Sequence, residues 1–517
     1  MSQDGVSRRY FFYGSLLAGA VPLAGWGSVP SLKALGYKPF YEKLNVAAIG
    51  CGGQGGADLN DAARTENIVA LCDVDETRAA ANFKKFDKQP KYKDFRVMLE
   101  KEGKNIDAVT IGIPDFMHAT VALLCMQHGK HVYVEKPLTR TPSEARLLME
   151  AAAKYKVATQ MGNQGFSHEA NRVAAEIVWS GAIGDVTEVH ISTTPGTHPT
   201  GLKQQPPEAS VPNTLDWQAW LGGAPMRAYS PYYTPYNWRG FLDFGTGQIG
   251  NWATHTAGPV QTALMLGAPT SIERVSVAGE SNITYPDRAT VRVDFPQRGG
   301  MPPVKVFYHD GPHSTDPDLF NVPGMENETI LPPANNLADK GRPGVGRGAA
   351  AGRGGAGGRG GAPATAPARD PNAPRQGAGG AGVQVFGEPV GPTRPGVLTG
   401  NGAVFIGTKG IMATRERGEG VWLLPAARWA EYVLPPQLLT RSPGHMLDWV
   451  RACKGGDPGC SDFAITAPYA EWLALVAIAL HVPGKLDWDS KLQRFTNNAE
   501  ANKFVKPVFK KGWELKI

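Results

Sequence analysis

The fold of this chain is decided by the stretch Leu44-Asn45-Val46-Ala47-Ala48-Ile49-Gly50-Cys51-Gly52-Gly53-Gln54-Gly55. Its first half is a short apolar run rich in branched residues, which predicts a buried strand. The glycines then follow the spacing G-x-G-x-x-G, and residues 56–63 can continue as a helix. A turn without side chains before a helix N-terminus lets a pyrophosphate reach unpaired backbone N–H groups. We therefore expect five residues of this turn to contact a dinucleotide: Gly50, Gly52, Gly53, Gln54 and Gly55.

An acidic residue lies at the matching distance from these glycines. Residues 68–73 are predicted to form a second strand that ends in Asp73. This position is about 20 residues past the turn, where a carboxylate holds the ribose hydroxyls of a dinucleotide. Because that carboxylate would repel a 2′-phosphate, the expected cofactor is NAD, and NADP is less favoured.

Strands and helices alternate from residue 44 to about residue 162. Such alternation requires a parallel sheet that is covered by helices on both faces. We therefore predict an α/β Rossmann domain over 44–162. Beyond the two strands already named, strands are expected at 106–111, 132–134 and 157–161, and helices at 76–86, 116–128 and 144–155.

Composition limits the classes of function. The chain has 517 residues, which is enough for two or three domains, and its net charge of +6 is too mild to indicate a nucleic-acid partner. The five cysteines have no metal-ligand spacing, so no metal site is expected. Cys453 and Cys460 are the only plausible disulfide partners, and two free thiols are the favoured interpretation.

Two segments are predicted to lie outside the globular fold. Within residues 1–30, Ser7-Arg8-Arg9-Tyr10-Phe11-Phe12 precedes a short apolar run, which resembles a twin-arginine export signal. An export signal of this kind predicts a periplasmic or membrane-tethered protein. The apolar run itself is too short for a stable membrane span. Residues 341–383 are rich in Gly, Arg and Pro and are predicted to be a disordered insertion. They lack the interleaved aromatics that stack on nucleic-acid bases.

Several motifs together resemble the Gfo/Idh/MocA oxidoreductases, a family that includes glucose–fructose oxidoreductase and inositol dehydrogenase. Besides the glycine turn, the resemblance in the first domain is carried by Cys72-Asp73-Val74-Asp75, Pro114-Asp115-x-x-His118-Ala119 and Glu135-Lys136-Pro137-Leu138. In the second domain it is carried by Trp217-x-x-Trp220-Leu221-Gly222, Asn237-Trp238-Arg239, Asp243-Phe244-Gly245-Thr246-Gly247, the segment around His255, residues 405–410 and residues 485–489.

The resemblance implies a second domain over 163–490 with a mostly antiparallel open sheet and helices on one face. Apolar and polar residues alternate as expected for such strands at 187–194, 272–278, 289–295, 304–309 and 404–406. In the family the open face of this sheet packs against another subunit, which implies a homo-oligomer. Helices at 444–453 and 468–480 are expected to return and cover the nucleotide domain.

Lys136 is the first candidate for catalysis. It follows a strand at the carboxyl edge of the parallel sheet, where doubly wound folds place their sites. In the family this lysine contacts both the substrate hydroxyl and the nicotinamide region. Pro114, His118 and Glu135 are expected beside the cofactor, with His118 in a structural or cofactor-adjacent role.

His255 is the candidate base, because oxidising an alcohol requires a group that accepts the hydroxyl proton. Many family members have Asp-x-x-x-His here, in which a carboxylate four residues earlier orients the imidazole. This chain has Asn251 at that position, and an amide cannot stabilise an imidazolium by charge. Either His255 is a weaker base, or another acid such as Asp243 replaces the carboxylate, or the chemistry is altered.

Three residues could line a sugar site. The indole of Trp238 can stack on a pyranose, the guanidinium of Arg239 can bind hydroxyls, and Asp243 lies nearby in sequence.

Three functions of the protein stay open. The first is NAD-dependent hydride transfer between the nicotinamide and a secondary hydroxyl of a sugar or sugar derivative. The second is glycoside cleavage through transient oxidation of a ring hydroxyl, although Trp252 stands where that branch has a tyrosine. The third is sugar binding without turnover.

Overall fold

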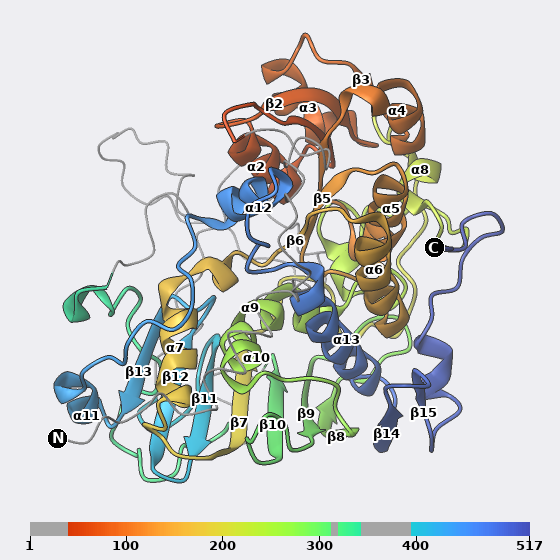
Figure 1. The fold of residues 1–517 in the computed structure, drawn as a ribbon. Helices are drawn as coiled ribbons and strands as arrows, with labels where there is room; N and C mark the ends of the chain where they lie inside the picture. Colours follow the sequence, from red (N-terminus) through yellow and green to blue (C-terminus); the bar gives the residue numbers. More distant parts are fainter. Residues whose placement is uncertain (1–39, 312–318, 343–393) are drawn as a thin grey trace, which may run out of the picture.

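A computed structural model of the protein describes residues 40–311, 319–342 and 394–517, and it contains two sheets (Figure 1). The predicted export segment lies outside these residues. The predicted insertion also lies outside them, except for its first two residues.

The first sheet is parallel throughout, with strand order β3-β2-β1-β4-β5-β6. Its strands are β1 (Asn45–Ile49), β2 (Asn67–Cys72), β3 (Lys91–Tyr92), β4 (Ala108–Ile111), β5 (His131–Glu135) and β6 (Thr159–Gly162). The connecting helices are α2 (Gly53–Ala62), α3 (Glu76–Lys85), α4 (Phe95–Glu102), α5 (Asp115–Gln127) and α6 (Pro142–Tyr155). The predicted Rossmann fold is confirmed, and the two-residue β3 is an additional strand at its edge.

Side chains fix where these helices begin. The Asp75 carboxylate caps α3, the Asp94 carboxylate caps α4, and Thr141 and Glu144 form a capping box at the start of α6. Each cap satisfies backbone N–H groups that have no partner within the helix. The helices therefore start immediately after the loops at the carboxyl edge of the sheet.

The glycine turn is fixed by close backbone contacts. Gly50 has a φ of +85°, and a Cβ there would lie 2.2 Å from the carbonyl oxygen of Gly112. A Cβ on Gly55 would lie 2.4 Å from the carbonyl oxygen of Gly50. Any side chain at either position would push α2 away from β1 and β4, so glycine is required for this corner to form.

The second sheet has nine strands in the order β13-β12-β11-β7-β10-β9-β8-β14-β15. All its pairs are antiparallel except β7 with β10, so the predicted mostly antiparallel sheet is confirmed. Figure 1 shows α7 (Glu169–Trp179) and α10 (Gly258–Leu264) against one face. The strands are β7 (Val186–Thr193), β8 (Ser271–Ala278), β9 (Arg288–Phe295), β10 (Val304–Asp310), β11 (Gly402–Gly407), β12 (Gly410–Arg415), β13 (Gly420–Leu424), β14 (Lys485–Asp489) and β15 (Arg494–Phe495).

Part of the opposite face is covered by the chain itself, through the segment 319–342. The Phe320 ring stacks on the His190 ring of β7, and a Cβ on Gly402 of β11 would lie 2.5 Å from the Leu331 side chain. The indole of Trp422 donates a hydrogen bond to the Ile330 carbonyl oxygen at 2.9 Å. Segment 319–342 therefore covers part of strands β7, β11 and β13 on the face that was expected to pack against another subunit.

Two late helices complete the nucleotide domain. From α12 (His445–Cys453), Met446, Trp449 and Val450 pack in one core cluster with Val46 and Ala48 of β1 and Leu59 of α2. Helix α13 (Phe463–Ala479) packs along α6 and also contacts β6, β8 and β9, so it joins the two sheets (Figure 1). No helix in the described ranges is long and apolar enough to cross a membrane. All five cysteines are free thiols, as favoured from the sequence.

Candidate active site

The glycine turn and the start of α2 form one wall of the candidate site. Helix α2 has no side-chain N-cap and no acidic residue in its first turn, so none of its own side chains neutralises the positive end of its dipole. Gln54 does not fill this space, because its amide donates to Asp58 Oδ1 at 3.0 Å. An uncapped helix N-terminus behind a glycine turn fits the pyrophosphate of a dinucleotide.

Asp73 lies at the tip of β2, against the same turn. Its carboxylate accepts the Cys51 N–H at 2.7 Å and the Asp75 N–H at 2.9 Å. Burial raises the pKa of Asp73, and these backbone hydrogen bonds act in the opposite direction. The acid is therefore held at the position expected to meet the adenosine ribose.

Pro114 and His118 organise the loops after β4 and β5. Pro114 precedes the first residue of α5, and the His118 ring is buried beneath it. His118 Nδ1 lies 2.7 Å from the Pro137 carbonyl oxygen and Nε2 lies 2.8 Å from the Ile113 carbonyl oxygen. Burial lowers the pKa of His118. His118 thus bridges two loops of the site, which fits the structural role considered from the sequence.

Lys136 follows β5 and reaches across to the second domain. Its Nζ donates to the backbone oxygen of Asn251 at 2.6 Å and to Asn251 Oδ1 at 3.1 Å. Burial lowers the pKa of Lys136 to about 7, and the positive charges of Arg239 and Arg417 act in the same direction. The lowered pKa favours the unprotonated amine, which is the form that can accept a proton.

Asn251 is therefore a partner of Lys136, whereas in the family motif the residue at this position orients the histidine that corresponds to His255. Its amide nitrogen donates to the Tyr236 hydroxyl and to Gln248 Oε1, both at 3.1 Å. Within the described chain no hydrogen bond joins Asn251 to His255. The physical reason is the π-helical turn Ile249–Ala253, whose wider spacing changes the direction of side chains relative to an α-helix.

His255 lies in the helical turn that follows and is only 3% exposed. Its Nδ1 is buried and has no hydrogen-bond partner in the described residues, and its ring meets the edge of the Trp252 ring. Burial lowers the pKa of His255 well below its ordinary value, with a smaller contribution from the charges of Arg417 and Lys136. The His255 ring is thus buried near the charges of Arg417 and Lys136, and both the burial and these charges disfavour its protonated form.

Glu135 precedes Lys136 and is buried at 5% exposure. Its carboxylate accepts the Lys136 N–H at 3.1 Å and the Gln164 amide at 3.0 Å. Burial raises the pKa of Glu135. The side chain therefore supports the Lys136 loop from below.

The three residues predicted to contact a sugar lie in different environments in the structure. Trp238 is buried, and its indole donates to the Pro235 carbonyl oxygen at 3.2 Å, so the side chain is part of the core. Arg239 stays at the site, with its guanidinium 4.2 Å from the centroid of the Trp238 ring. Asp243 is exposed and forms an ion pair with Arg227. The suggestion that Asp243 replaces the missing carboxylate beside His255 is therefore wrong.

Sequence reasoning missed three side chains that complete the site. Tyr236 and Gln248 are hydrogen-bonded to the Asn251 amide, as described above. Arg417 comes from the turn between β12 and β13, and its guanidinium lies 5.5 Å from the Trp252 ring centroid. A hairpin residue more than 160 positions from Trp252 carries no local signal in the sequence.

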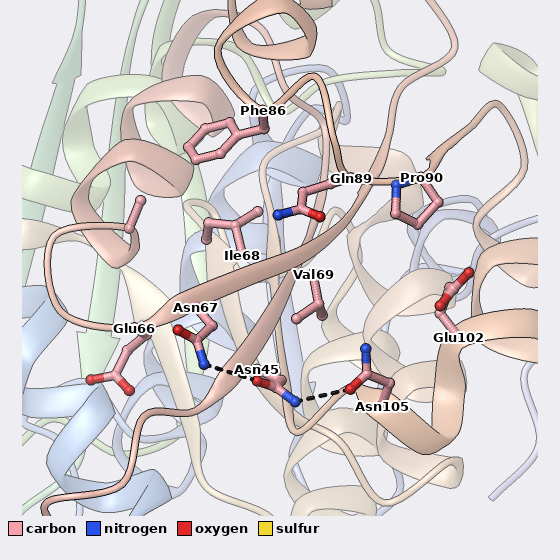
Figure 2. A pocket seen from close by; sticks show the side chains of 11 residues that line it. Asn45, Glu66, Asn67, Ile68, Val69, Phe86, Gln89, Pro90, Glu102 and Asn105 are labelled. Atoms are coloured by element: carbon pink, nitrogen blue, oxygen red, sulfur yellow. Dashed lines mark hydrogen bonds between the residues drawn. The ribbon is translucent and has the colours of Figure 1, made fainter.

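A separate pocket of about 570 Å³ lies at the opposite edge of the parallel sheet. Figure 2 shows its polar lining, in which Asn45 is hydrogen-bonded to both Asn67 and Asn105. These residues lie at the amino ends of β1 and β2 and after α4, away from the glycine turn. The pocket is therefore not part of the candidate active site.

The fold and this site define a two-domain protein with a dinucleotide-binding Rossmann domain and a second α/β domain that reaches the nucleotide edge. Residues 44–163 match the Gfo/Idh/MocA oxidoreductase family at its NAD-binding Rossmann fold, and residues 169–290 match its C-terminal alpha/beta domain. Both regions are thus similar to the corresponding domains of this family, as the motifs indicated.

Similar proteins include dehydrogenases and one glycosidase-family protein. The chain is 30% identical to inositol 2-dehydrogenase of Rubrobacter xylanophilus over 28% of this chain and 42% of that protein. It is 28% identical to a glycosyl hydrolase family 109 protein of Solibacter usitatus over 36% of this chain and 45% of that protein. It thus spans less than half the length of these relatives. The WlbA dehydrogenase of Bordetella pertussis, solved with NADH and UDP-GlcNAcA, has the same fold: the TM-score is 0.52 at 12% identity, over 87% of this chain and 99% of that one.

Proposed function

We propose that the protein is an NAD-dependent oxidoreductase that transfers hydride between the nicotinamide and a secondary hydroxyl of a sugar or sugar derivative. The observation that carries this proposal is the position of Lys136. Its amine lies at the carboxyl edge of the Rossmann sheet, is held by Asn251 of the second domain, and has a pKa lowered to about 7. The similarity to inositol 2-dehydrogenase supports a polyhydroxylated substrate.

The residues present divide the work of such a reaction. NAD, when bound, supplies the hydride acceptor. Lys136 Nζ takes the proton of the substrate hydroxyl as the carbon-bound hydrogen leaves with its electron pair, and the alcohol becomes a ketone. Asn251 keeps the amine aimed, and Tyr236 and Gln248 hold the Asn251 amide in turn. Such positioning contributes a large part of the acceleration in transfer reactions.

The test is to identify the nucleotide in freshly purified protein by mass spectrometry and then to follow NADH absorbance with a panel of sugars and polyols. We expect NAD or NADH and reduction of NAD by at least one compound. Lys136→Met should abolish turnover while leaving NADH binding within a few-fold, and Arg64→Gln, an exposed arginine of the nucleotide domain, should leave both unchanged. Turnover that survives in Lys136→Met would contradict the role of this amine.

A second candidate is NAD-dependent glycoside cleavage, which the similarity to a glycosyl hydrolase family 109 protein favours. In that reaction a ring hydroxyl is oxidised transiently, the aglycone is eliminated, and the hydride returns to the sugar. Release of nitrophenol from nitrophenyl glycosides without net NADH would select this function. Binding of sugar with neither product would select the third candidate, a sugar-binding protein without turnover.

We infer that the protein is exported by the twin-arginine route, to the periplasm or the outer face of the membrane, on the basis of Arg8 and Arg9 before an apolar run. Fractionation of cells that express the native chain or its Arg8→Lys/Arg9→Lys variant tests this, because the variant should stay in the cytoplasm.

We also infer that the protein forms a homo-oligomer through the second sheet. Light scattering on the purified protein tests it, and a monomeric mass would contradict it.

A further inference from the structure

The guanidinium of Arg239 is held rigidly beside the site. Its carbon lies 4.3 Å from the ring centroid of Tyr236 and 4.2 Å from that of Trp238, and Nη1 donates to the Tyr236 carbonyl oxygen at 3.3 Å. These contacts fix the plane of the group but use only one of its five N–H donors. Among the described residues no carboxylate lies within ion-pair distance of Arg239. A half-buried guanidinium fixed in this way is arranged to receive an anion.

His198 provides an independent sign of a missing ligand beside this arginine. The side chain is only 5% exposed, and neither ring nitrogen has a hydrogen-bond partner among the residues described. Buried polar atoms are nearly always paired, so two unpaired nitrogens on one ring require an explanation. Burial, together with the charge of Arg239, lowers the pKa of His198 to about 4. The ring is therefore neutral and offers one N–H donor.

The backbones next to the two side chains are in close contact. A Cβ on Gly240, which follows Arg239, would lie 2.0 Å from the carbonyl oxygen of Pro199, which follows His198. Arg239 is also connected to the catalytic lysine. It stacks on Tyr236, whose hydroxyl accepts from the Asn251 amide that holds Lys136. The arginine thus lies one aromatic ring away from the contact between Lys136 and Asn251.

These charges decide what kind of anion fits. One guanidinium with free N–H groups and one neutral imidazole N–H match a carboxylate, which is a planar monoanion that arginine binds through two parallel hydrogen bonds. A phosphate dianion would require more than one fixed positive charge here. We propose that Arg239 and His198 form a subsite for a carboxylate of the substrate, so that the enzyme acts on a sugar acid. This inference rests on the proposed function, because it names the class of substrate for the same site.

The test compares D-galacturonate with its methyl ester, which keeps the hydroxyls and removes the charge, and includes glucose 6-phosphate and myo-inositol. We expect kcat/KM for NADH formation to be about 10–100-fold higher for the acid than for the ester, the range of one charge-assisted pair of hydrogen bonds. Arg239→Gln should remove this preference and His198→Phe should weaken it, whereas the control Arg64→Gln should preserve it. The comparison of the acid with its ester uses the native protein, so this result does not depend on whether the variants fold.

Equal use of acid and ester, or a preference for the phosphate or for neutral compounds, would overturn the carboxylate subsite while the proposed function stood. If no compound reduces NAD, the proposed function fails separately. In that case calorimetric titration of the NADH-loaded protein with galacturonate and its ester decides the subsite alone. Tighter binding of the acid that weakens with salt supports it, and equal or absent binding of the two overturns it.

Discussion

Replacing Asn251 by aspartate tests which group accepts the proton. In the native site the Asn251 Oδ1 lies 3.1 Å from Lys136 Nζ, so Asn251→Asp places a carboxylate against the amine. At an effective dielectric constant of about 20, two unit charges at this separation attract by about 5 kcal/mol. Desolvation of the new carboxylate opposes part of this attraction. An opposite charge at such distances typically shifts a pKa by about 1–3 units.

The direction of the shift follows from the charge. A carboxylate stabilises the ammonium form, so the pKa of Lys136 should rise from about 7 to about 8–10. At pH 7 the unprotonated fraction of the amine then falls by about fivefold for a shift of one unit, and by more for a larger shift. We expect kcat/KM for NADH formation at pH 7 to fall in proportion and to recover as the pH approaches the new pKa.

The assay is the pH profile of kcat/KM for NADH formation, from about pH 6 to pH 10, in the native protein and in Asn251→Asp. Asn105→Asp is the matched control, because it adds the same charge at the exposed opposite edge of the Rossmann sheet. An inflection that stays near pH 7 in Asn251→Asp would refute the assignment of Lys136 as the proton acceptor. Higher activity of the variant at pH 7 would instead favour His255 as the proton acceptor, activated by the new carboxylate.

Three further outcomes follow from the same structure. Burial lowers the pKa of Lys136 from 10.5 to about 7, so the folded state binds fewer protons than the unfolded state between these values and stability should rise with pH across this window. Lys136→Met should accordingly raise the free energy of unfolding at pH 7 by about 1–2 kcal/mol in urea titrations, allowing for partial exposure, and an unchanged or lower value would contradict this. Asp73→Ser should increase the ratio of kcat/KM for NADP to that for NAD, because it removes the carboxylate at the ribose position; an unchanged ratio would place the 2′-hydroxyl elsewhere. Lys454→Met should destabilise the fold by about 3–5 kcal/mol, because it leaves the Glu66 carboxylate buried without its ion-pair partner at 3.0 Å, and a loss below about 1 kcal/mol would show that water reaches Glu66.

The parts of the fold that local chemistry determines were predicted from the sequence. Gly50 and Gly55 mark the nucleotide corner because no side chain fits there, and the spacing to Asp73 follows from the length of one helix and one strand. Alternating residues marked the central strands of the second sheet. Strands β14 and β15 at one end of the sheet and the hairpin β12–β13 were missed, because short strands between turns carry little periodic signal.

The site was predicted only in part, for a different physical reason. Lys136 was identified from its position after a parallel strand, but its contact with Asn251 was not predicted. The i, i+4 rule assumes an α-helix, and Asn251 lies in a π-helical turn that points its amide to Lys136. Tyr236 and Arg417 come from a loop and a hairpin that only the tertiary fold brings to this place.

The packing of α12 against β1 and α2 has a consequence for how the chain is made. Trp449 fills the same core cluster as Val46 and Leu59, so the nucleotide domain lacks part of its interior until translation has passed residue 453. During that interval the apolar surface that α12 later covers is open to solvent or to chaperones. Chains truncated before residue 445 should therefore emerge from the ribosome as aggregation-prone species, even though their glycine turn and parallel strands are intact.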